Sequence, residues 1–334
     1  MTGVALRRRT RSWLRAVYTC CAGATALVSC GFAAAQSYPV KPIRLLVPFP
    51  PGPSADYVAR LVGMRMASSL GQPIIFENRA GANGAIATEL VARAPADGYT
   101  LQVGTSSTHL SAAFLTRNLP YDPFKDFTPI IALVDPTTCV AVHSSVPATS
   151  IRELLDYARR NPGRLSYSSS GTGGFLHLAM EQLKQATGTD MVHVPYKGAG
   201  PAVADLAAGT VQVAVISVAN ARPLAAAGKV RMLAYLDRYS YVPADAPVLA
   251  EQTPGFEKLP AFFGFYGPAG LPRAVVQRVH DEAQRALDAP EVKTRLVEQD
   301  YGIIGGTPED FAAMVKKGAE TYARVIKAAG IQPE

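Results

Sequence analysis

The feature that most constrains this chain is a repeated alternation of short apolar runs with amphipathic helical patterns, from residue 42 onward. The run Ile43–Val47 is followed by a helical pattern that begins near Ala55, and the same order recurs at residues 73–77 and 85–93. Short connections between such units predict a parallel sheet with helices on both faces. We therefore expect an α/β protein.

A second cycle of strands and helices begins at residues 139–143. It follows a stretch at residues 119–127 that breaks the rhythm and is expected to wrap over the surface. The aromatic run at residues 262–266 is interpreted as a strand that returns to the first cycle. Two such crossings predict two α/β lobes joined by a two-strand hinge, with the ligand cleft between them. The predicted boundaries are residues 36–140 with 262–334 for lobe 1, and residues 141–261 for lobe 2.

Basic, apolar and small residues follow one another at the start of the chain. Five arginines between Arg7 and Arg15 precede an apolar run at residues 16–35, which ends in an A-x-A site before Gln36. This order predicts a secretory signal peptide over residues 1–35. Its removal leaves 28 basic and 26 acidic residues, so the formal net charge falls from +7 to +2. The charge argument for a nucleic-acid partner therefore disappears.

Three of the four cysteines lie in the predicted signal peptide, so the mature chain keeps only Cys139 and forms no internal disulfide. A lone cysteine in an apolar run is expected to be a core residue. Residues 27–30 also fit a lipoprotein cleavage box, in which Cys30 would carry lipid. The site at residues 33–35 favours release into the periplasm instead. No later apolar run is long enough to span a bilayer, so we expect a soluble periplasmic protein.

A proline-rich loop at residues 48–56 joins the first strand to the first helix. Four prolines and a glycine restrict its backbone, and Ser54 is placed to cap the helix. The remaining first-turn N–H groups, at the positive end of the helix dipole, favour an anion such as a carboxylate. Two interpretations of Asp56 stay open: it contacts a ligand, or it is an ordinary first-turn helix acid.

Small, polar or glycine-rich residues also follow the other predicted strands. The main stretches are residues 105–108, 168–174, 196–200, 217–220 and 237–239. In parallel sheets the carboxyl ends of the strands face the ligand crevice, and two lobes turn two such edges towards each other. Hydroxyl and backbone N–H groups in these loops suit the binding of a carboxylate without a covalent step.

The motifs of enzymes and metal sites are missing. Residues 168–174 contain no G-x-S-x-G elbow of a hydrolase, and the glycines at 171–174 depart from the dinucleotide fingerprint G-x-G-x-x-G. None of the five histidines has the spacing of a metal ligand pair. We therefore predict no enzyme activity, no cofactor and no metal. His177 is interpreted as a packed or capping histidine, whereas Lys197 either pairs with a ligand or is a solvated loop residue.

Several separate motifs, in order, resemble one family. They are residues 47–52 with Asp56 and residues 59–60, then residues 77–84, 97–101 and 193–198. From about Tyr38 to the C-terminus the chain is similar to the Bug receptors, the periplasmic substrate-binding proteins of tripartite tricarboxylate transporters. The resemblance implies a type II periplasmic-binding-protein fold, of the Venus-flytrap kind, that closes on a small organic acid.

The resemblance also implies how the ligand is held. The loop at residues 48–56 and the loop at residues 168–174 would bind a carboxylate through backbone N–H groups, hydroxyls and ordered water. One position departs from the family pattern, because Pro53 stands where a second glycine usually follows Gly52. Proline has no N–H, so one carboxylate donor is missing there. Phe49 is expected to form an apolar wall.

The expected function is capture of a small organic acid or amino acid by a monomer, with delivery to the membrane subunits of a tripartite transporter. A ligand-sensing receptor for a signalling partner and a periplasmic hydrolase are the alternatives. The residues predicted to bind substrate come from the loops described above. They are Phe49, Gly52, Ser54, Ala55, Asp56, Thr105, Ser106, Ser170, Gly171, Thr172, Gly173, His177, Tyr196, Lys197, Ser217 and Asp237.

Overall fold

The computed structural model describes residues 38–52, 55–238 and 242–333. From Lys41 onward the chain forms one compact unit. The predicted signal peptide, the alternative lipid site at Cys30, and both Pro53 and Ser54 lie outside the described residues.

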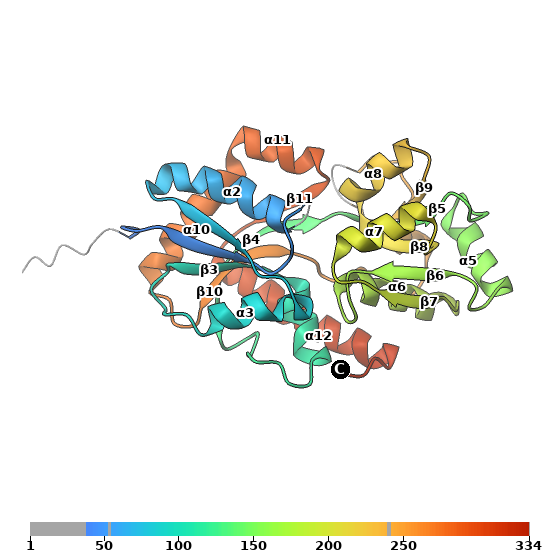
Figure 1. Cartoon of the computed structure of the whole chain (residues 1–334), viewed down its shortest axis with the longest axis horizontal. Helices are drawn as coiled ribbons and strands as arrows, with labels where there is room; N and C mark the ends of the chain where they lie inside the picture. Colours follow the sequence, from blue (N-terminus) through green and yellow to red (C-terminus); the bar gives the residue numbers. More distant parts are fainter. Residues whose placement is uncertain (1–37, 53–54, 239–241, 334) are drawn as a thin grey trace, which may run out of the picture. The chain divides into compact units, whose positions relative to one another are not determined.

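Six strands form the first sheet, in the order β11-β4-β10-β3-β1-β2 (Figure 1). They are β1 (Ile43–Val47), β2 (Ile74–Asn78), β3 (Thr100–Thr105), β4 (Phe127–Pro136), β10 (Phe263–Pro268) and β11 (Tyr301–Gly305). Strand β1 runs parallel to β2 and β3, but β10 is antiparallel to β3 and β4, and β11 is antiparallel to β4. The prediction of a parallel sheet is therefore confirmed for β1, β2 and β3 and wrong for β4, β10 and β11. Because β4 leaves towards the second sheet and β10 returns from it, the two strands run in opposite directions.

Five strands form the second sheet, in the order β7-β6-β8-β5-β9. They are β5 (Thr138–His143), β6 (Ser166–Ser169), β7 (Val192–Pro195), β8 (Val213–Ser217) and β9 (Val230–Tyr235). Strand β6 is parallel to β7 and β8, whereas β5 is antiparallel to β8 and β9. The chain passes between the sheets after β4 and again between β9 and β10. The residue boundaries of the two lobes stay a prediction.

Helices cover the two sheets and connect their strands (Figure 1). Most begin within three residues of the predicted positions, and α6 and α12 have the predicted bounds. The helices are α2 (Ala55–Leu70), η1 (Ala82–Gly84), α3 (Ala85–Ala92), η2 (Ser107–Ser111), α4 (Ala112–Leu115), α5 (Ile151–Arg160), α6 (Phe175–Thr187), α7 (Ala199–Ala208), α8 (Val218–Ala226), α9 (Leu249–Gln252), α10 (Arg273–Asp288), α11 (Pro290–Glu298) and α12 (Pro308–Ala329).

The start of α5 shows how the sequence determines a helix end. The hydroxyl of Ser150 accepts a hydrogen bond from the Glu153 N–H at 3.2 Å, as the capping-box spacing predicts. The Glu153 carboxylate accepts from the N–H of Thr149 rather than from that of Ser150. The longer helix α12 carries a complete capping box, formed by Thr307 and Asp310.

Two aromatic residues of the segment at residues 119–127, Tyr121 and Phe127, pack inward, so the prediction that the segment wraps over the surface is wrong for them, whereas Phe124 is exposed. Tyr121 and Phe127 are both 6% exposed, with their rings edge to face at 5.6 Å. The Tyr121 hydroxyl donates to the carbonyl of Thr108 at 2.9 Å. Phe127 is also the first residue of β4, a strand that the sequence pattern does not indicate.

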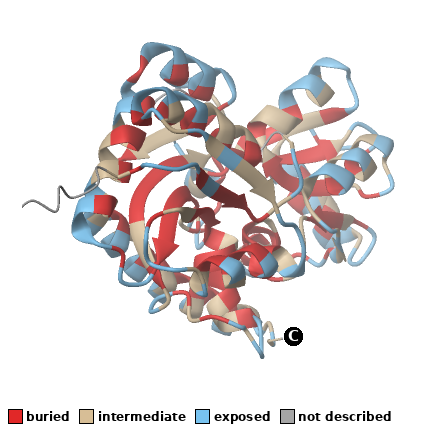
Figure 2. Cartoon of the chain, turned by 60° about the vertical axis from the view of Figure 1, so that its left-hand side comes forward, coloured by how far each residue is buried: buried red, intermediate tan, exposed pale blue. Residues whose placement is uncertain are grey.

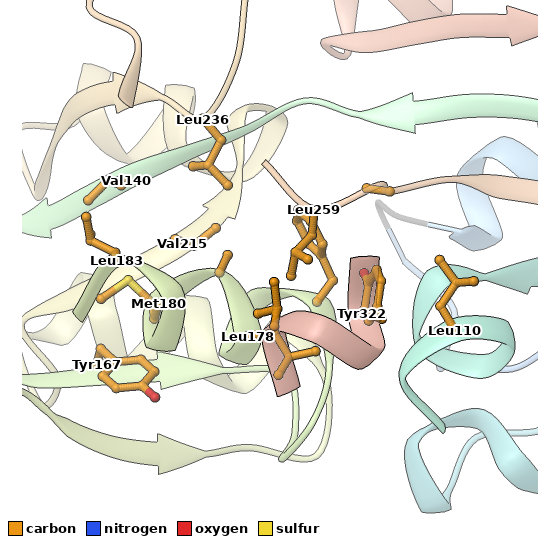
Figure 3. Close-up of a cluster of buried hydrophobic side chains, with 14 of the residues drawn as sticks. Leu110, Val140, Tyr167, Leu178, Met180, Leu183, Val215, Leu236, Leu259 and Tyr322 are labelled. Atoms are coloured by element: carbon orange, nitrogen blue, oxygen red, sulfur yellow. The ribbon is translucent and has the colours of Figure 1, made fainter. Parts of the chain in front are cut away.

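Buried residues lie along the strands of both sheets and along parts of the helices (Figure 2). One apolar cluster extends from Leu110 and Tyr322, beside the first sheet, to Val140 in β5 of the second sheet and Met180 on α6 (Figure 3). Helix α12 contacts β4 and η2 on one side and α6 on the other, so it packs against both halves of the unit. Cys139 is fully buried and unpaired in a second cluster, which confirms that it is a core residue, and burial raises the pKa of its thiol.

Candidate ligand-binding site

A cavity of about 300 Å³ is lined by residues from both sheets. The first sheet contributes residues 49–52, after β1, and residues 105–107, at the end of β3. The second sheet contributes residues 168–170 and 215–217, at the carboxyl ends of β6 and β8, and residues 197–203, after β7. The cavity thus lies where the carboxyl ends of parallel strands meet, which is where α/β proteins bind ligands.

The walls of the cavity are mainly apolar. Phe49, Phe175, Leu176, Phe262 and Phe263 line it, together with several prolines and alanines. Within the described ranges, Lys197 is the one charged side chain among the lining residues. An apolar cavity with a few placed polar groups is typical of a small-molecule site.

Asp56 holds the loop after β1 in place. Its carboxylate accepts hydrogen bonds from Gly52 N–H at 3.3 Å, from Asn78 Nδ2 at 2.9 Å and from Arg60 Nε at 3.0 Å. Asn78 also donates to the carbonyl of Phe49 at 2.9 Å. Although burial opposes its charge, the hydrogen bonds from Arg60, Asn78 and Gly52 hold the pKa of Asp56 below its usual range. Asp56 does not line the cavity, so these contacts favour the interpretation as a helix acid that shapes the loop.

Two histidines, His177 and His193, support the glycine-rich loop after β6 through hydrogen bonds. The Gly173 N–H donates to His177 Nδ1 at 2.9 Å, and the Gly171 N–H donates to the hydroxyl of Ser169 at 3.3 Å. That hydroxyl also bonds His193 Nε2 at 2.7 Å, and the two imidazole rings stack at 3.9 Å. Burial lowers the pKa of both histidines, that of His193 to about 4. These contacts favour the interpretation of His177 as a packed residue, which holds the backbone just before the start of α6.

Residues 58–331 match the family described as the tripartite tricarboxylate transporter family receptor. The chain belongs to this family. Its members are solute-binding receptors that act in the periplasm, not enzymes, and the resemblance to the Bug receptors is confirmed.

Solved structures share both the sequence and the fold of this receptor. The structure of a periplasmic transporter is 42% identical, covers 89% of this chain and 99% of its own, and has a TM-score of 0.82. R. palustris Rpa4515 with adipate is 34% identical, with coverage of 89% and 100% and a TM-score of 0.84. MatC from Rhodopseudomonas palustris with bound malate is 33% identical, with coverage of 86% and 100% and a TM-score of 0.78. These similarities confirm two α/β lobes of the periplasmic-binding-protein type.

No helix in the described part of the receptor combines the length and the apolar composition needed to cross a bilayer.

The structure of the receptor brings part of the predicted binding set to the cavity wall. Seven members of the predicted set line the cavity, and they are Phe49, Gly52, Thr105, Ser106, Ser170, Lys197 and Ser217. The members that do not line it are Ala55, Asp56, Gly171, Thr172, Gly173, His177, Tyr196 and Asp237. Some of these have structural partners; the Tyr196 hydroxyl, for example, donates to Asp205 at 2.6 Å. Ser54 lies outside the described residues.

Several lining residues of the receptor are absent from the predicted set. Pro136 and Thr138 come from the first passage between the sheets, and Phe262 and Phe263 from the second. Phe175 is the first residue of α6. The sequence pattern predicts that the first strand of the second sheet begins at Cys139, whereas β5 begins one residue earlier, at Thr138. The polar residue at the start of this strand is the signal that could have identified Thr138 as a lining residue.

Proposed function

We propose that this receptor captures a small carboxylate in the cavity and delivers it to the membrane subunits of a tripartite transporter. The observation that carries the proposal is Lys197, the one charged side chain among the described lining residues of a mainly apolar cavity. Lys197 is exposed, and its ammonium group can attract an anion at the cavity wall, while the aromatic walls suit the carbon skeleton of an organic acid. The similar proteins with bound adipate and malate support this ligand class.

Hydroxyl groups are further hydrogen-bond donors along the cavity wall. Three of the nearby backbone N–H groups, those of Gly52, Gly171 and Gly173, already have acceptors within the protein. Thr105, Ser106, Ser170 and Ser217 are the members of the predicted set that line the cavity with a hydroxyl group. We infer that Lys197, these hydroxyls and water hold the carboxylate, because water-mediated contacts orient a ligand nearly as well as direct ones.

Delivery to a transporter requires a conformational signal. The chain passes between the sheets twice, after β4 and before β10. Two connecting strands form a hinge about which lobes close on a ligand. We propose that the receptor acts as a monomer, does not bind nucleic acid, and reaches the periplasm through its N-terminal signal, with lipid attachment at Cys30 as the alternative.

A thermal-shift screen of residues 36–334 against organic acids and amino acids tests the proposal. At least one small acid should raise the melting temperature, and Lys197→Gln should reduce that shift. Lys229→Gln removes an exposed lysine that does not line the cavity and should leave the shift unchanged.

Two results would change the assignment. If no acid stabilises the receptor while an ester or glycoside is turned over, the hydrolase alternative replaces the proposal. If acids stabilise it but deletion of the gene leaves uptake of the bound acid intact, the signalling role replaces transport.

A further inference from the structure

The glycine-rich stretch at residues 171–174, after β6 of the second sheet, lies against helices that follow β3 of the first sheet. A Cβ added at Gly173 would lie 2.7 Å from Leu115 Cδ1, and one added at Gly174 would lie 3.7 Å from Ser107 Oγ. Glycine allows this close approach because it has no side chain. The stretch is therefore a contact between the two halves of the receptor.

This contact is continuous with the wall of the cavity. Ser170 lies immediately before the stretch and Phe175 immediately after it, and both residues line the cavity. Ser107, on the other side of the contact, lines the cavity as well. Any displacement of residues 171–174 thus changes both the cavity wall and the packing of one half against the other.

A hydrogen bond from α6 holds the stretch in place. The N–H of Gly173 donates to Nδ1 of His177 at 2.9 Å. A backbone N–H can only donate, so this Nδ1 is the unprotonated nitrogen of a neutral imidazole, whereas both ring nitrogens of an imidazolium are donors. Protonation of His177 therefore removes the acceptor of the Gly173 N–H and places two donors opposite each other.

Several titratable groups surround His177. Its ring stacks on that of His193, on β7, at 3.9 Å and on that of Tyr167, on β6, at 6.3 Å. Burial is the largest effect and holds the pKa of His177 below its usual value, while Glu181 raises this pKa and Lys184 lowers it. Loss of the Gly173 hydrogen bond admits water to the ring and relieves the burial, so the released form binds a proton more readily.

We propose that His177 is a positioning residue for ligand binding, whose neutral imidazole holds residues 171–174 in the contact between the halves and whose protonation releases them. The inference rests on the proposed function, because it takes the closure of the two halves on a carboxylate as the event that this contact favours. Binding is then tightest while His177 is neutral. It weakens as the pH falls through the pKa of His177, because the proton favours the released form.

The ligand-free receptor gives the first test. Nuclear magnetic resonance of isotope-labelled residues 36–334 follows the Gly173 amide from pH 7.5 to pH 4.5. Its resonance should shift as His177 takes up a proton, because the amide loses its acceptor. In His177→Asn the side-chain carbonyl is an acceptor that does not titrate, so the shift should disappear. A resonance that does not move in the wild type, or that moves equally in His177→Asn, overturns the proposal.

Ligand affinity gives the second test. Calorimetric titrations with adipate and with malate, at pH 7.5 and pH 5.0, give the ratio of the two affinities for each protein. This ratio should be about tenfold larger for the wild type than for His177→Asn, since the titration of the acid itself affects both proteins equally. His177→Leu has no acceptor and should bind more weakly than His177→Asn at pH 7.5.

Thr187→Val is the matched control on the same helix. It removes a hydrogen bond from the Thr187 hydroxyl to the Leu183 carbonyl, and Thr187 does not line the cavity. The control should retain the wild-type ratio of affinities. If His177→Leu does not fold, the comparison of His177→Asn with the wild type is sufficient.

The outcomes separate the two proposals. Equal ratios for the wild type and His177→Asn overturn the role of His177 and leave the proposed function standing. If neither acid binds at pH 7.5, the proposed function is contradicted for these two acids, and the Gly173 resonance alone then supports or overturns the role of His177.

Discussion

Arg222 and Asp300 join the two halves of the receptor through a paired hydrogen bond. The guanidinium of Arg222, on α8, donates from Nε and Nη2 to the Asp300 carboxylate at 2.6 and 2.7 Å. Asp300 immediately precedes β11 of the first sheet, and its carbonyl accepts from the N–H of Thr137, between β4 and β5, at 3.2 Å. The pair therefore lies beside the first passage between the sheets.

Arg222→Gln should destabilise the receptor by about 1–2 kcal/mol. The Asp300 side chain is 5% exposed, so the variant leaves a buried carboxylate without its cation, whereas the half-exposed Arg222 limits the loss. Urea unfolding measures the change. Arg324→Gln breaks an exposed pair with Glu257 and should cost less than about 0.5 kcal/mol. Equal effects of the two variants would show that the Arg222 contact does not stabilise the fold.

Asp56→Asn should weaken both the fold and ligand binding. The amide places hydrogen-bond donors where Asn78 and Arg60 already donate, at an expected cost of about 1–3 kcal/mol. The low pKa of Asp56 stabilises the fold above its unfolded-state value near 3.9, and this contribution is lost as the pH falls through the lower folded value. Unfolding curves at pH 7 and pH 3 should thus differ less for the variant than for the wild type. Equal differences between pH 7 and pH 3 in the variant and the wild type would contradict this role of Asp56.

The stacked histidines predict a further pH dependence. Burial lowers the folded-state pKa of His177 and of His193, that of His193 to about 4. Between about pH 4 and about pH 6.5, these two imidazoles therefore hold fewer protons in the folded protein than in the unfolded chain. The stabilising contribution of these two histidines to the free energy of unfolding is complete above about pH 6.5 and declines as the pH falls towards about 4. Glu181 and Lys184 also act on His193 electrostatically, with opposite signs.

His193→Gln keeps a hydrogen-bonding group near Ser169 but does not titrate. The free energy of unfolding, measured from pH 7.5 to pH 4.5, should depend less steeply on pH in this variant than in the wild type. An unchanged slope in His193→Gln would exclude His193 as a source of the pH dependence.

Gly173→Ala should destabilise the loop after β6 and lower ligand affinity. Gly173 has a φ of +74°, and an added Cβ would lie 2.7 Å from Leu115 Cδ1. Gly188→Ala is a matched control, because its φ is +64° but no atom lies within 4 Å of an added Cβ. Both variants incur the backbone strain of about 1 kcal/mol. Only Gly173→Ala should also reduce affinity in a ligand titration, and a similar reduction for Gly188→Ala would contradict the role of the close contact with Leu115.

Local signals in the sequence predict the helices and fail for one long strand. The capped, amphipathic helix α12 (Pro308–Ala329) has the predicted bounds because its start and apolar stripe are encoded within the segment. Strand β4 contains Pro129 and ends at Asp135 and Pro136, residues that are uncommon in strands. Its pairing with β10 and β11 comes from residues far away in the chain, which periodicity does not detect.

The residues of the binding site likewise fall into those that local sequence signals predict and those that they do not. Loops after predicted strands, such as those with Phe49 and Lys197, reach the cavity because the carboxyl ends of parallel strands share an edge. Thr138 and Phe262 reach it from the passages between the sheets, whose positions depend on the tertiary fold. Asp56 was open to two interpretations, and only its hydrogen-bond partners favour one of them.

The most direct test of the proposed function is a calorimetric titration of residues 36–334 with the acid that stabilises the receptor most. The account predicts saturable binding with one site, at least tenfold weaker in Lys197→Gln and unchanged in Lys229→Gln, because Lys197 alone supplies positive charge among the described lining residues. Equal affinities for the wild type and Lys197→Gln, or the absence of binding for every acid, would contradict it.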